Sequence, residues 1–317
     1  MRDQTEVLLT VRCLTYNHAP YIRRCLEGLV GQKTNFRFEV MVHDDASTDG
    51  TADIVREFAQ KYPDIIKPIL ETENLHSKRD GSLERVTYTS LKGKYIAWCE
   101  GDDYWTDEHK LQKQVDFLEQ NPDFVLACTD YALVDDEGKE KFHNKTKRLS
   151  EDMRLASREL VLGRNPIIAV SSCFRKGIME EYRKWIENSS YNVGIGDYPM
   201  WIYFSTKGRI KHLDEKMVAY RVLEKSASHS QDSEKMKSFR DNTMNLAIWM
   251  NKQLGIGVNT KDIKFKFSKM KVRDMAKFSK RIYCKTYLEA IRDDWRIAFD
   301  GKLWAVSVVR LLFNKKC

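Results

Sequence analysis

Glu100-Gly101-Asp102-Asp103 is the cluster in this sequence best suited to metal chemistry. It follows the apolar run Tyr95–Cys99, so its carboxylates are expected where a strand ends, and the glycine lets the chain bend there. Carboxylate oxygens suit Mg²⁺ or Mn²⁺, and such an ion usually takes substrate phosphates to complete its ligand shell. The cluster therefore predicts a metal site that serves a phosphorylated ligand. A solvated acidic turn is the alternative.

A second acidic cluster, Asp-Asp-Ala-Ser-Thr-Asp-Gly-Thr, occupies residues 44–51 at the end of the apolar run Phe38–Val42. A carboxylate at such a position can accept a hydrogen bond from a base N–H or a ribose hydroxyl. Asp45 is the first candidate for that role and Asp44 the second. Residues 47–49 are expected to cap the helix that follows.

The segments around these clusters alternate between strand and helix patterns. Val7–Thr15 and Phe38–Val42 are apolar runs, and helical patterns follow each of them. Further strands are expected at Ile65–Leu70, Tyr95–Cys99 and Phe124–Tyr131. This alternation predicts an α/β fold, in which a mostly parallel central sheet carries helices on its faces.

Ligands of such sheets bind at the carboxyl ends of the strands, and the polar clusters fall at these ends. They are Thr15-Tyr16-Asn17, Asp44-Asp45 and residues 100–103, so three separate segments are expected to converge on one edge. Residues 135–150 are expected to form a mobile loop, and the chain from Asn242 onward to be mostly helical.

With these motifs in place, about the first 105 residues resemble glycosyltransferase family 2, the inverting enzymes with the GT-A fold. Leu14–Asn17 looks like the first-strand nucleotide motif, and residues 44–51 are similar to the D-D-x-S-x-D-x-T block. Gly93–Ile96 leads into a turn that looks like the metal-binding turn, although Glu100 stands where the family usually has aspartate. Four motifs in the family's order and spacing form a specific signal.

The resemblance implies a role for each candidate residue. Tyr16 is expected to flank a uracil-like base, Asp45 to bond its ring N–H, Asp102 to contact the ribose and Asp103 to hold the metal. Glu100 is expected to support the metal-binding residues without contacting the ion itself. The nucleotide-sugar-binding set is Thr15, Tyr16, Asn17, Asp45, Arg85, Asp102 and Arg221, and the metal ligands are Asp103 and Asp102.

Asp197 is the candidate catalytic base, because residues 193–201 resemble the family's acidic acceptor-side motif. An aspartate beside Gly196 and Trp201 could be partly desolvated, which would raise its pKa and suit it to accept a proton. The alternative is a helix N-cap that precedes Pro199, and one side chain could serve both roles. Arg221 is a candidate to bind a phosphate of the donor. Alternatively, it belongs to a surface connection between a strand and a helix.

Other classes of enzyme lack their signatures in this sequence. No glycine-rich dinucleotide fingerprint follows the first strand, and no P-loop motif occurs. The Q-x-x-R-W signature of processive polysaccharide synthases is also missing, which favours addition of a single sugar. A non-catalytic scaffold that binds nucleotide-sugars or carbohydrate within a polysaccharide assembly complex remains the alternative.

The composition is that of a globular protein, with 42% hydrophobic and 32% charged residues in 317. Residues 1–6 are charged, and Arg12 interrupts the apolar run that follows them. This pattern predicts neither a signal peptide nor a membrane-spanning helix, so a cytoplasmic protein is expected. Seven cysteines without a C-x-x-C pair are expected to be reduced and buried.

Positive charge is concentrated near the end of the chain. Residues 226–317 carry 20 Lys/Arg against 9 Asp/Glu, so with a total net charge of +8 the first 225 residues are acidic overall. This separation points to a basic appendage rather than to a nucleic-acid-binding domain. Residues 261–285 are expected to form one basic amphipathic helix, and residues 261–313 to meet an anionic membrane or to pack on the catalytic domain.

These observations predict a transferase domain at residues 1–228 and a basic helical region at residues 229–317. The expected enzyme is a metal-dependent inverting glycosyltransferase. It would move one sugar from a nucleotide-sugar, with a UDP-sugar as the default donor, to a hydroxyl of a glycan or lipid-linked acceptor. Cell-surface polysaccharide biosynthesis is the expected setting, and the sequence does not identify the sugar.

Overall fold

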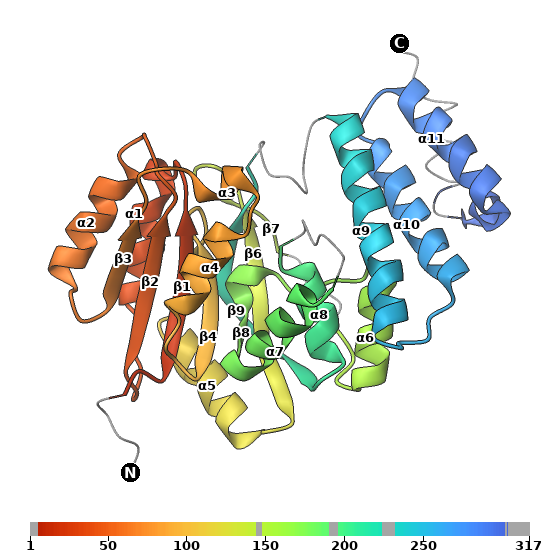
Figure 1. Ribbon diagram of the computed structural model, residues 1–317. Coiled ribbons are helices and arrows are strands. Elements are labelled where there is room, and N and C mark those ends of the chain that lie inside the picture. Colours follow the sequence, from red (N-terminus) through yellow and green to blue (C-terminus); the bar gives the residue numbers. More distant parts are fainter. Residues whose placement is uncertain (1–5, 144–147, 190–195, 224–231, 302, 304–317) are drawn as a thin grey trace. The chain divides into compact units, whose positions relative to one another are not determined.

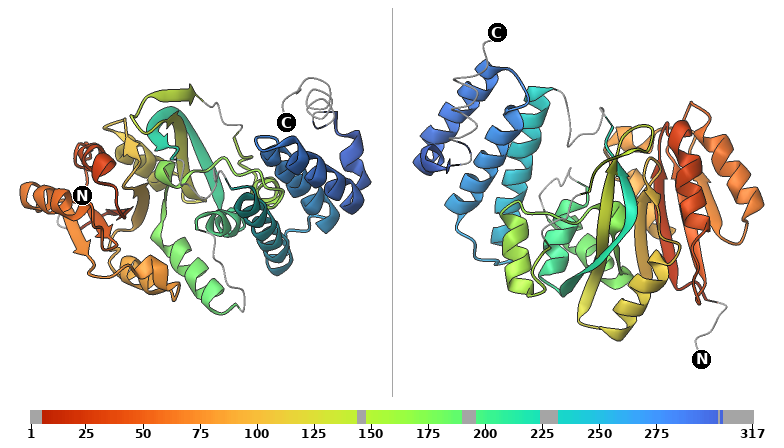
Figure 2. Two further views of the ribbon diagram at one scale, coloured as in Figure 1. Left: turned by 90° about the horizontal axis from the view of Figure 1, so that it is seen from above. Right: turned by 180° about the vertical axis from the view of Figure 1, so that it is seen from behind.

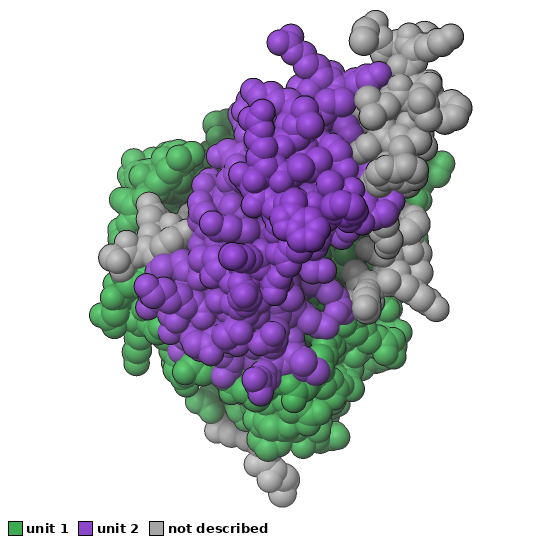
Figure 3. Space-filling model, turned by 90° about the vertical axis from the view of Figure 1, so that its right-hand side faces the viewer, with its two compact units in different colours: residues 1–153, 166–191, 207–222 green, residues 154–165, 192–206, 223–317 purple. Residues whose placement is uncertain are grey.

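The computed structural model describes residues 6–143, 148–189, 196–223, 232–301 and 303 (Figure 1). Contacts divide the chain into two units, which Figure 3 shows in different colours. Unit 1 comprises residues 1–153, 166–191 and 207–222, and unit 2 comprises residues 154–165, 192–206 and 223–317. The predicted domain boundary at residue 228 lies outside the described residues.

Unit 1 is built on one mixed sheet (Figure 1). In the described part of the chain its strands follow the order β3-β2-β1-β4-β8-β6-β9-β5, with β7 paired to β6. The strands are β1 Leu9–Thr15, β2 Phe38–Asp44, β3 Ile66–Leu70, β4 Tyr95–Glu100, β5 Tyr104–Trp105, β6 Phe124–Val134, β7 Glu140–His143, β8 Cys173–Arg175 and β9 Arg209–Arg221.

The predicted α/β class is confirmed, and the sheet is parallel where the sequence alternates between strand and helix. β1 pairs in parallel with β2 and β4, and β2 pairs in parallel with β3. Beyond β4 the directions mix: β8 runs antiparallel to β4 and β6, whereas β6 and β9 lie side by side in parallel (Figure 2). Of residues 135–150, predicted to be a mobile loop, residues 144–147 lie outside the described residues, and the part before them includes β7, which forms a hairpin with β6.

Helices of unit 1 bury one apolar face each. In α1, Ile22, Cys25, Leu26 and Leu29 are fully buried, as their spacing predicts. The helix α2 begins at Thr51 with Gly50 at its N-cap, where φ is 94°, so none of residues 47–49 occupies the N-cap position. Capping by this segment is nevertheless present in part, because Asp49 Oδ1 accepts a hydrogen bond from Thr51 N at 3.0 Å. The helices are α1 Ala19–Val30, α2 Thr51–Lys61, α3 Leu75–Lys78, α4 Ser82–Thr89, α5 Lys110–Gln120, the 3₁₀ helix η1 Ala169–Ser171 and α7 Lys176–Glu187.

The cysteines of the described residues are all free, and five of the six are buried. Cys25 lies with its Sγ 3.9 Å from that of Cys13 and 3.7 Å from that of Cys99. Burial is the main cause that raises the pKa of Cys99 to about 11, which keeps its thiol protonated and unreactive at neutral pH. In this part of the chain the expected free thiols are present, and the expected burial holds for every cysteine except Cys284.

Unit 2 is helical. Its longest helices pack in chain order, α9 against α10 and α10 against α11. Up to residue 301 the predicted helices from Asn242 onward are present, although the first of them already begins at Ser233. The elements are α6 Met153–Val161, which starts at the last residue of a unit 1 segment, α8 Tyr198–Ser205, α9 Ser233–Gln253, α10 Thr260–Met275, α11 Lys280–Asp293 and the 3₁₀ helix η3 Trp295–Phe299.

The basic amphipathic helix predicted at residues 261–285 is not one helix. Ser279 accepts a hydrogen bond from Ile282 N and starts α11, so the chain turns after α10. The apolar positions Ile263, Phe267 and Met275 are at most 2% exposed, because they pack inside unit 2. These side chains are therefore not available to a membrane. Among the described residues, no helix is both long and apolar enough to cross a bilayer.

Candidate active site

Backbone hydrogen bonds join the carboxyl ends of the first strands. Asp45 N donates to Thr15 O at 3.0 Å, which joins β2 to β1. Gly101 N donates to Leu14 O at 2.8 Å, which joins the acidic turn after β4 to β1. The three polar segments identified in the sequence therefore lie together at one edge of the sheet, as predicted.

Residues 47–49 tie the loop after β2 to the loop after β1. The Asn17 side chain accepts from Thr48 N at 2.9 Å, and Asn17 N donates to Ser47 Oγ at 2.8 Å. Asp49 Oδ2 accepts from Ala19 N at 3.0 Å. Asn17 has φ of 54°, a left-handed conformation that asparagine tolerates better than most residues. These contacts fix the segment that carries Thr15 and Tyr16.

Asp44 and Asp45 both use their carboxylates within the protein. Asp44 accepts from Ser47 N at 3.0 Å, whereas Asp45 accepts from Leu75 N at 2.7 Å and from His76 N at 3.0 Å. Asp45 thus anchors the first turn of α3. A carboxylate has about four lone-pair positions, so Asp45 can still accept a base N–H, and its predicted role stays a prediction.

Tyr16 and Thr15 differ in how they meet solvent. The Tyr16 ring is 46% exposed, which leaves a face for stacking on a base. The Thr15 hydroxyl is buried and has no hydrogen-bond partner among the described residues. A Cβ at Gly101 would lie 2.5 Å from Thr15 Oγ1, so only glycine fits at this point of the acidic turn.

The acidic turn itself presents a buried carboxylate beside a partly exposed one. Asp103 is 3% exposed, and its Oδ1 accepts a hydrogen bond from Arg221 N at 2.8 Å. Burial, followed by the charge of Asp102, raises the pKa of Asp103 well above its ordinary value. A divalent cation would relieve this cost, so the donor set fits Mg²⁺ or Mn²⁺.

The two aspartates would supply only part of a ligand shell. Within the described ranges, no three His, Cys, Asp or Glu side chains are grouped closely enough to hold a metal alone. Glu100 is directed elsewhere, since its Oε1 lies 3.9 Å from Arg12 Nη1. Substrate phosphates and water would therefore complete the shell, as is common for Mg²⁺.

Arg221 clamps the acidic turn. Its Nε donates to Asp102 O at 2.8 Å, and its Nη1 donates at 2.6 Å to each of the carbonyls of Asp135 and Asp136. The guanidinium lies 4.5 Å from the centre of the Tyr21 ring, and the residue is 3% exposed. These contacts support a positioning role for the side chain, whereas its predicted contact with the nucleotide-sugar stays a prediction.

Lysine in place of Arg221 is expected to loosen the turn, because one ammonium cannot reach the three carbonyls that the guanidinium fork holds. We expect the Kd for Mn²⁺ in the presence of nucleotide to rise about tenfold, the effect of losing about 1.4 kcal/mol. Titration calorimetry of Arg221→Lys measures this change. Arg23→Lys is the matched control, since Arg23 forms an exposed ion pair with Glu57. Equal Mn²⁺ affinity in both variants would contradict the positioning role.

Arg85 lies exposed on α4, where its Nη1 donates to Asp80 O at 2.9 Å. This contact orders the start of the helix and leaves most of the guanidinium in solvent. The predicted role of Arg85 in donor binding therefore stays a prediction.

Asp197 precedes α8 in unit 2 and is partly buried. It occupies the predicted N-cap position, but its carboxylate makes no capping hydrogen bond. Instead, Trp201 Nε1 donates to Asp197 Oδ2 at 3.0 Å. Burial raises the pKa of Asp197, and this hydrogen bond partly offsets the effect. The expected desolvation is present, whereas the expected capping by the side chain is not.

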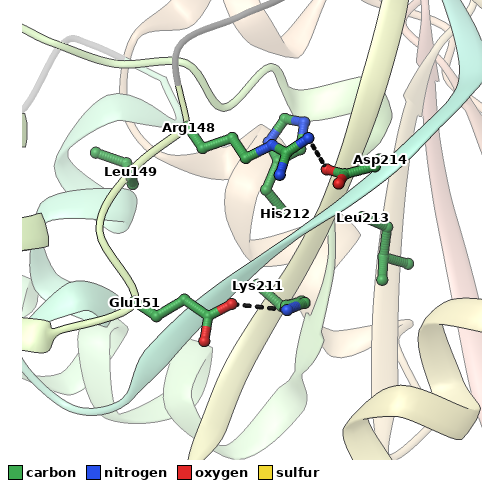
Figure 4. Close-up of a pocket in the computed structure, with 7 residues that line it drawn as sticks. All are labelled: Arg148, Leu149, Glu151, Lys211, His212, Leu213 and Asp214. Carbon is green, nitrogen blue, oxygen red and sulfur yellow. Dashed lines mark hydrogen bonds and ion pairs between the residues drawn. The ribbon is translucent and has the colours of Figure 1, made fainter.

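A pocket of about 180 Å³ lies beside the first half of β9 (Figure 4). Its charged side chains are paired with one another: Lys211 Nζ lies 2.7 Å from Glu151 Oε1, and Arg148 binds Asp214. Because these cations are already neutralised, we assign no donor phosphate to this pocket.

The sequence of this chain is similar to those of a known family. Residues 11–183 match the family model described as glycosyl transferase family 2. An uncharacterized protein of Mycobacterium tuberculosis strain H37Rv is 30% identical over 231 residues, which are 72% of this chain and 63% of that protein. TuaG of Bacillus subtilis, provisionally named a teichuronic acid biosynthesis glycosyltransferase, is 27% identical over 229 residues, covering 71% of this chain and 82% of TuaG. The chain thus spans less than two thirds of the mycobacterial relative.

Solved structures share the fold. Residues 1–349 of S. aureus TarS, in complex with UDP-GlcNAc, superpose with a TM-score of 0.60 at 17% identity, covering 95% of this chain and 88% of that one. The mannosyltransferase PcManGT from Pyrobaculum calidifontis, in complex with GDP-Man and Mn²⁺, superposes with a TM-score of 0.53 at 17% identity, covering 97% and 88%. The sheet and helices described above therefore share their fold with these two proteins.

Proposed function

Because the chain belongs to glycosyl transferase family 2 and is a glycosyltransferase, we propose that it transfers a single sugar, with inversion and in a metal-dependent reaction. The donor is a nucleotide-sugar, by proposal a UDP-sugar, and the acceptor is a hydroxyl of a glycan or lipid-linked molecule. The observation that carries the proposal is the buried Asp103 beside Asp102, which Arg221 holds at the carboxyl edge of the sheet.

The donor would be held by the convergent strand ends. Tyr16 offers an exposed ring for the base, Asp45 retains lone pairs for a base N–H, and Thr15 has a buried hydroxyl in need of a partner. A carboxylate that accepts one N–H suits the uracil edge. The UDP-GlcNAc complex of TarS supports this choice, whereas the GDP-Man complex of PcManGT keeps a guanine nucleotide as the competing donor.

Asp103 and Asp102 would hold Mg²⁺ or Mn²⁺, which supplies positive charge against the departing diphosphate. Arg221 would keep the turn in place, because its backbone N donates to the Asp103 carboxylate and its Nε donates to the Asp102 carbonyl. Asp197 would accept the proton of the attacking hydroxyl, a role for which its raised pKa and partial burial suit it. The polysaccharide setting is proposed from the name of TuaG.

The test is a donor screen with the full chain. UDP- and GDP-sugars are incubated with and without Mn²⁺, and nucleoside diphosphate release and sugar transfer to glycan acceptors are measured. We expect release from a UDP-sugar that requires Mn²⁺ and stops with a chelator. A scaffold would bind the donor without releasing nucleoside diphosphate. Binding of a donor with no release for any donor and acceptor pair would therefore reject the catalytic proposal.

Peripheral contact with an anionic membrane belongs to the same proposal, since a lipid-linked acceptor resides there. Its support is the excess of basic residues after residue 225. The apolar face of α10 cannot provide the contact, because it is buried.

A further inference from the structure

Two aromatic rings of η3 stand in solvent. Trp295 is 69% exposed and Phe299 is 79% exposed, and their ring centres lie 5.8 Å apart in an edge-to-face arrangement. Only Ile297, between them, is buried in unit 2. Exposed rings of this size forgo the hydrophobic gain of burial, so a neighbouring aromatic pair indicates a surface that meets a partner.

Basic side chains line the surface beside this pair. Lys261, Lys264 and Arg292 form one shallow pocket with Trp295, and none of the three makes an ion pair with another described residue. Arg296 lies in the same pocket but is held by Asp294 at 2.7 Å and Asp262 at 2.8 Å. The pocket also holds Asp262, Asp293 and Asp294, so four cations face three carboxylates and the surface beside the rings carries a net charge of +1.

We propose that the aromatic pair Trp295–Phe299 and the cations Lys261, Lys264 and Arg292 form a docking surface for anionic lipid membranes. The rings would enter the boundary between headgroups and acyl chains, and the cations would meet lipid phosphates. The inference deepens the proposed membrane contact and rests on it. It does not depend on the chemistry of sugar transfer.

Charge and geometry favour a membrane over a protein partner. Tryptophan at the edge of an apolar patch is typical of membrane interfaces, where its ring and N–H meet different environments. Each basic residue near an anionic surface strengthens binding by about fivefold, so three such residues beside two rings give reversible association. A second copy of this chain would bring a surface of the same net positive charge.

The decisive variant is Trp295→Ser with Phe299→Ser in the full chain. Vesicles of phosphatidylglycerol and phosphatidylcholine are floated with the protein, and the bound fraction gives the partition constant. We expect a loss of at least about tenfold for the double variant. Leu155→Ser is the matched control, because Leu155 is 53% exposed on α6 and should bind vesicles as the wild type does.

Two further measurements test the contribution of the cations and distinguish a loss of membrane docking from a loss of catalysis. Lys261→Glu with Lys264→Glu should weaken binding to the mixed vesicles and remove most of its salt dependence. Transfer to a soluble acceptor should be unchanged in all variants, which separates failure of docking from failure of catalysis. Vesicle binding of the aromatic variant equal to that of Leu155→Ser would overturn the inference. So would sedimentation of a wild-type oligomer that this variant dissociates.

Discussion

Asparagine in place of Asp103 is expected to abolish metal-dependent transfer while leaving the metal-free protein at least as stable as the wild type. The amide oxygen can still accept the 2.8 Å hydrogen bond from Arg221 N, so the turn keeps its shape. The negative charge that would hold the metal is lost. We expect kcat to fall by roughly 10²–10³-fold or more, the scale for losing one preorganised electrostatic contact.

The stability expectation follows from the raised pKa of Asp103. When the folded pKa of an acid lies above its unfolded value, the folded state binds more protons, so stability falls as pH rises between the two pKa values. The asparagine side chain does not titrate, so the variant does not lose stability in this way. The melting temperature of Asp103→Asn in chelator should therefore match the wild type near pH 4 and exceed it increasingly toward neutral pH.

With added Mn²⁺ and nucleotide, the wild type should melt at a higher temperature than Asp103→Asn, because ligand binding stabilises only the protein that holds the metal. Turnover with Mn²⁺, and melting temperatures from pH 4 to pH 8 with chelator or with Mn²⁺, measure both effects. Asp53→Asn is the control, since Asp53 is an exposed carboxylate paired with Arg56 on α2. Metal-stimulated turnover in Asp103→Asn would remove Asp103 from the metal site.

The sequence predicted the strand-end carboxylates because their signal is local. An apolar run followed by acidic residues places Asp45 and Asp103 at strand ends, and parallel neighbours bring these ends together. The use of each carboxylate was not predictable in the same way. Asp45 binds the backbone of α3, 30 residues further along the chain, and no spacing rule connects the two segments.

Arg221 shows the same limit more strongly. Its three carbonyl partners come from Asp102, Asp135 and Asp136, which lie 119, 86 and 85 residues away in the sequence. Backbone carbonyls carry no residue identity, so a clamp of this kind leaves no motif. The helix predicted at residues 261–285 failed for another reason: apolar residues keep a helical spacing on both sides of Ser279, where the chain turns and α11 begins.

Asparagine in place of Asp197 is expected to stop catalysis without disturbing the protein around it. The amide oxygen can accept the hydrogen bond that Trp201 Nε1 donates to Asp197 Oδ2, and no capping bond is at stake. The melting temperature and the affinity for UDP should match those of the wild type. The amide cannot take a proton from the acceptor hydroxyl, so kcat should fall by roughly 10²–10⁴-fold, the scale for losing a general base.

The pH profile distinguishes a base from a residue that only positions Trp201. A general base works when deprotonated, so wild-type kcat should rise with pH through the raised pKa of Asp197. Trp201→Phe removes a hydrogen bond that lowers this pKa, so the rise should move to higher pH, whereas Asp197→Asn should lose it. If Asp197→Asn keeps kcat within a few-fold of wild type, the base lies elsewhere. Asp214 is a poor substitute, because it is exposed and already bound to Arg148 (Figure 4).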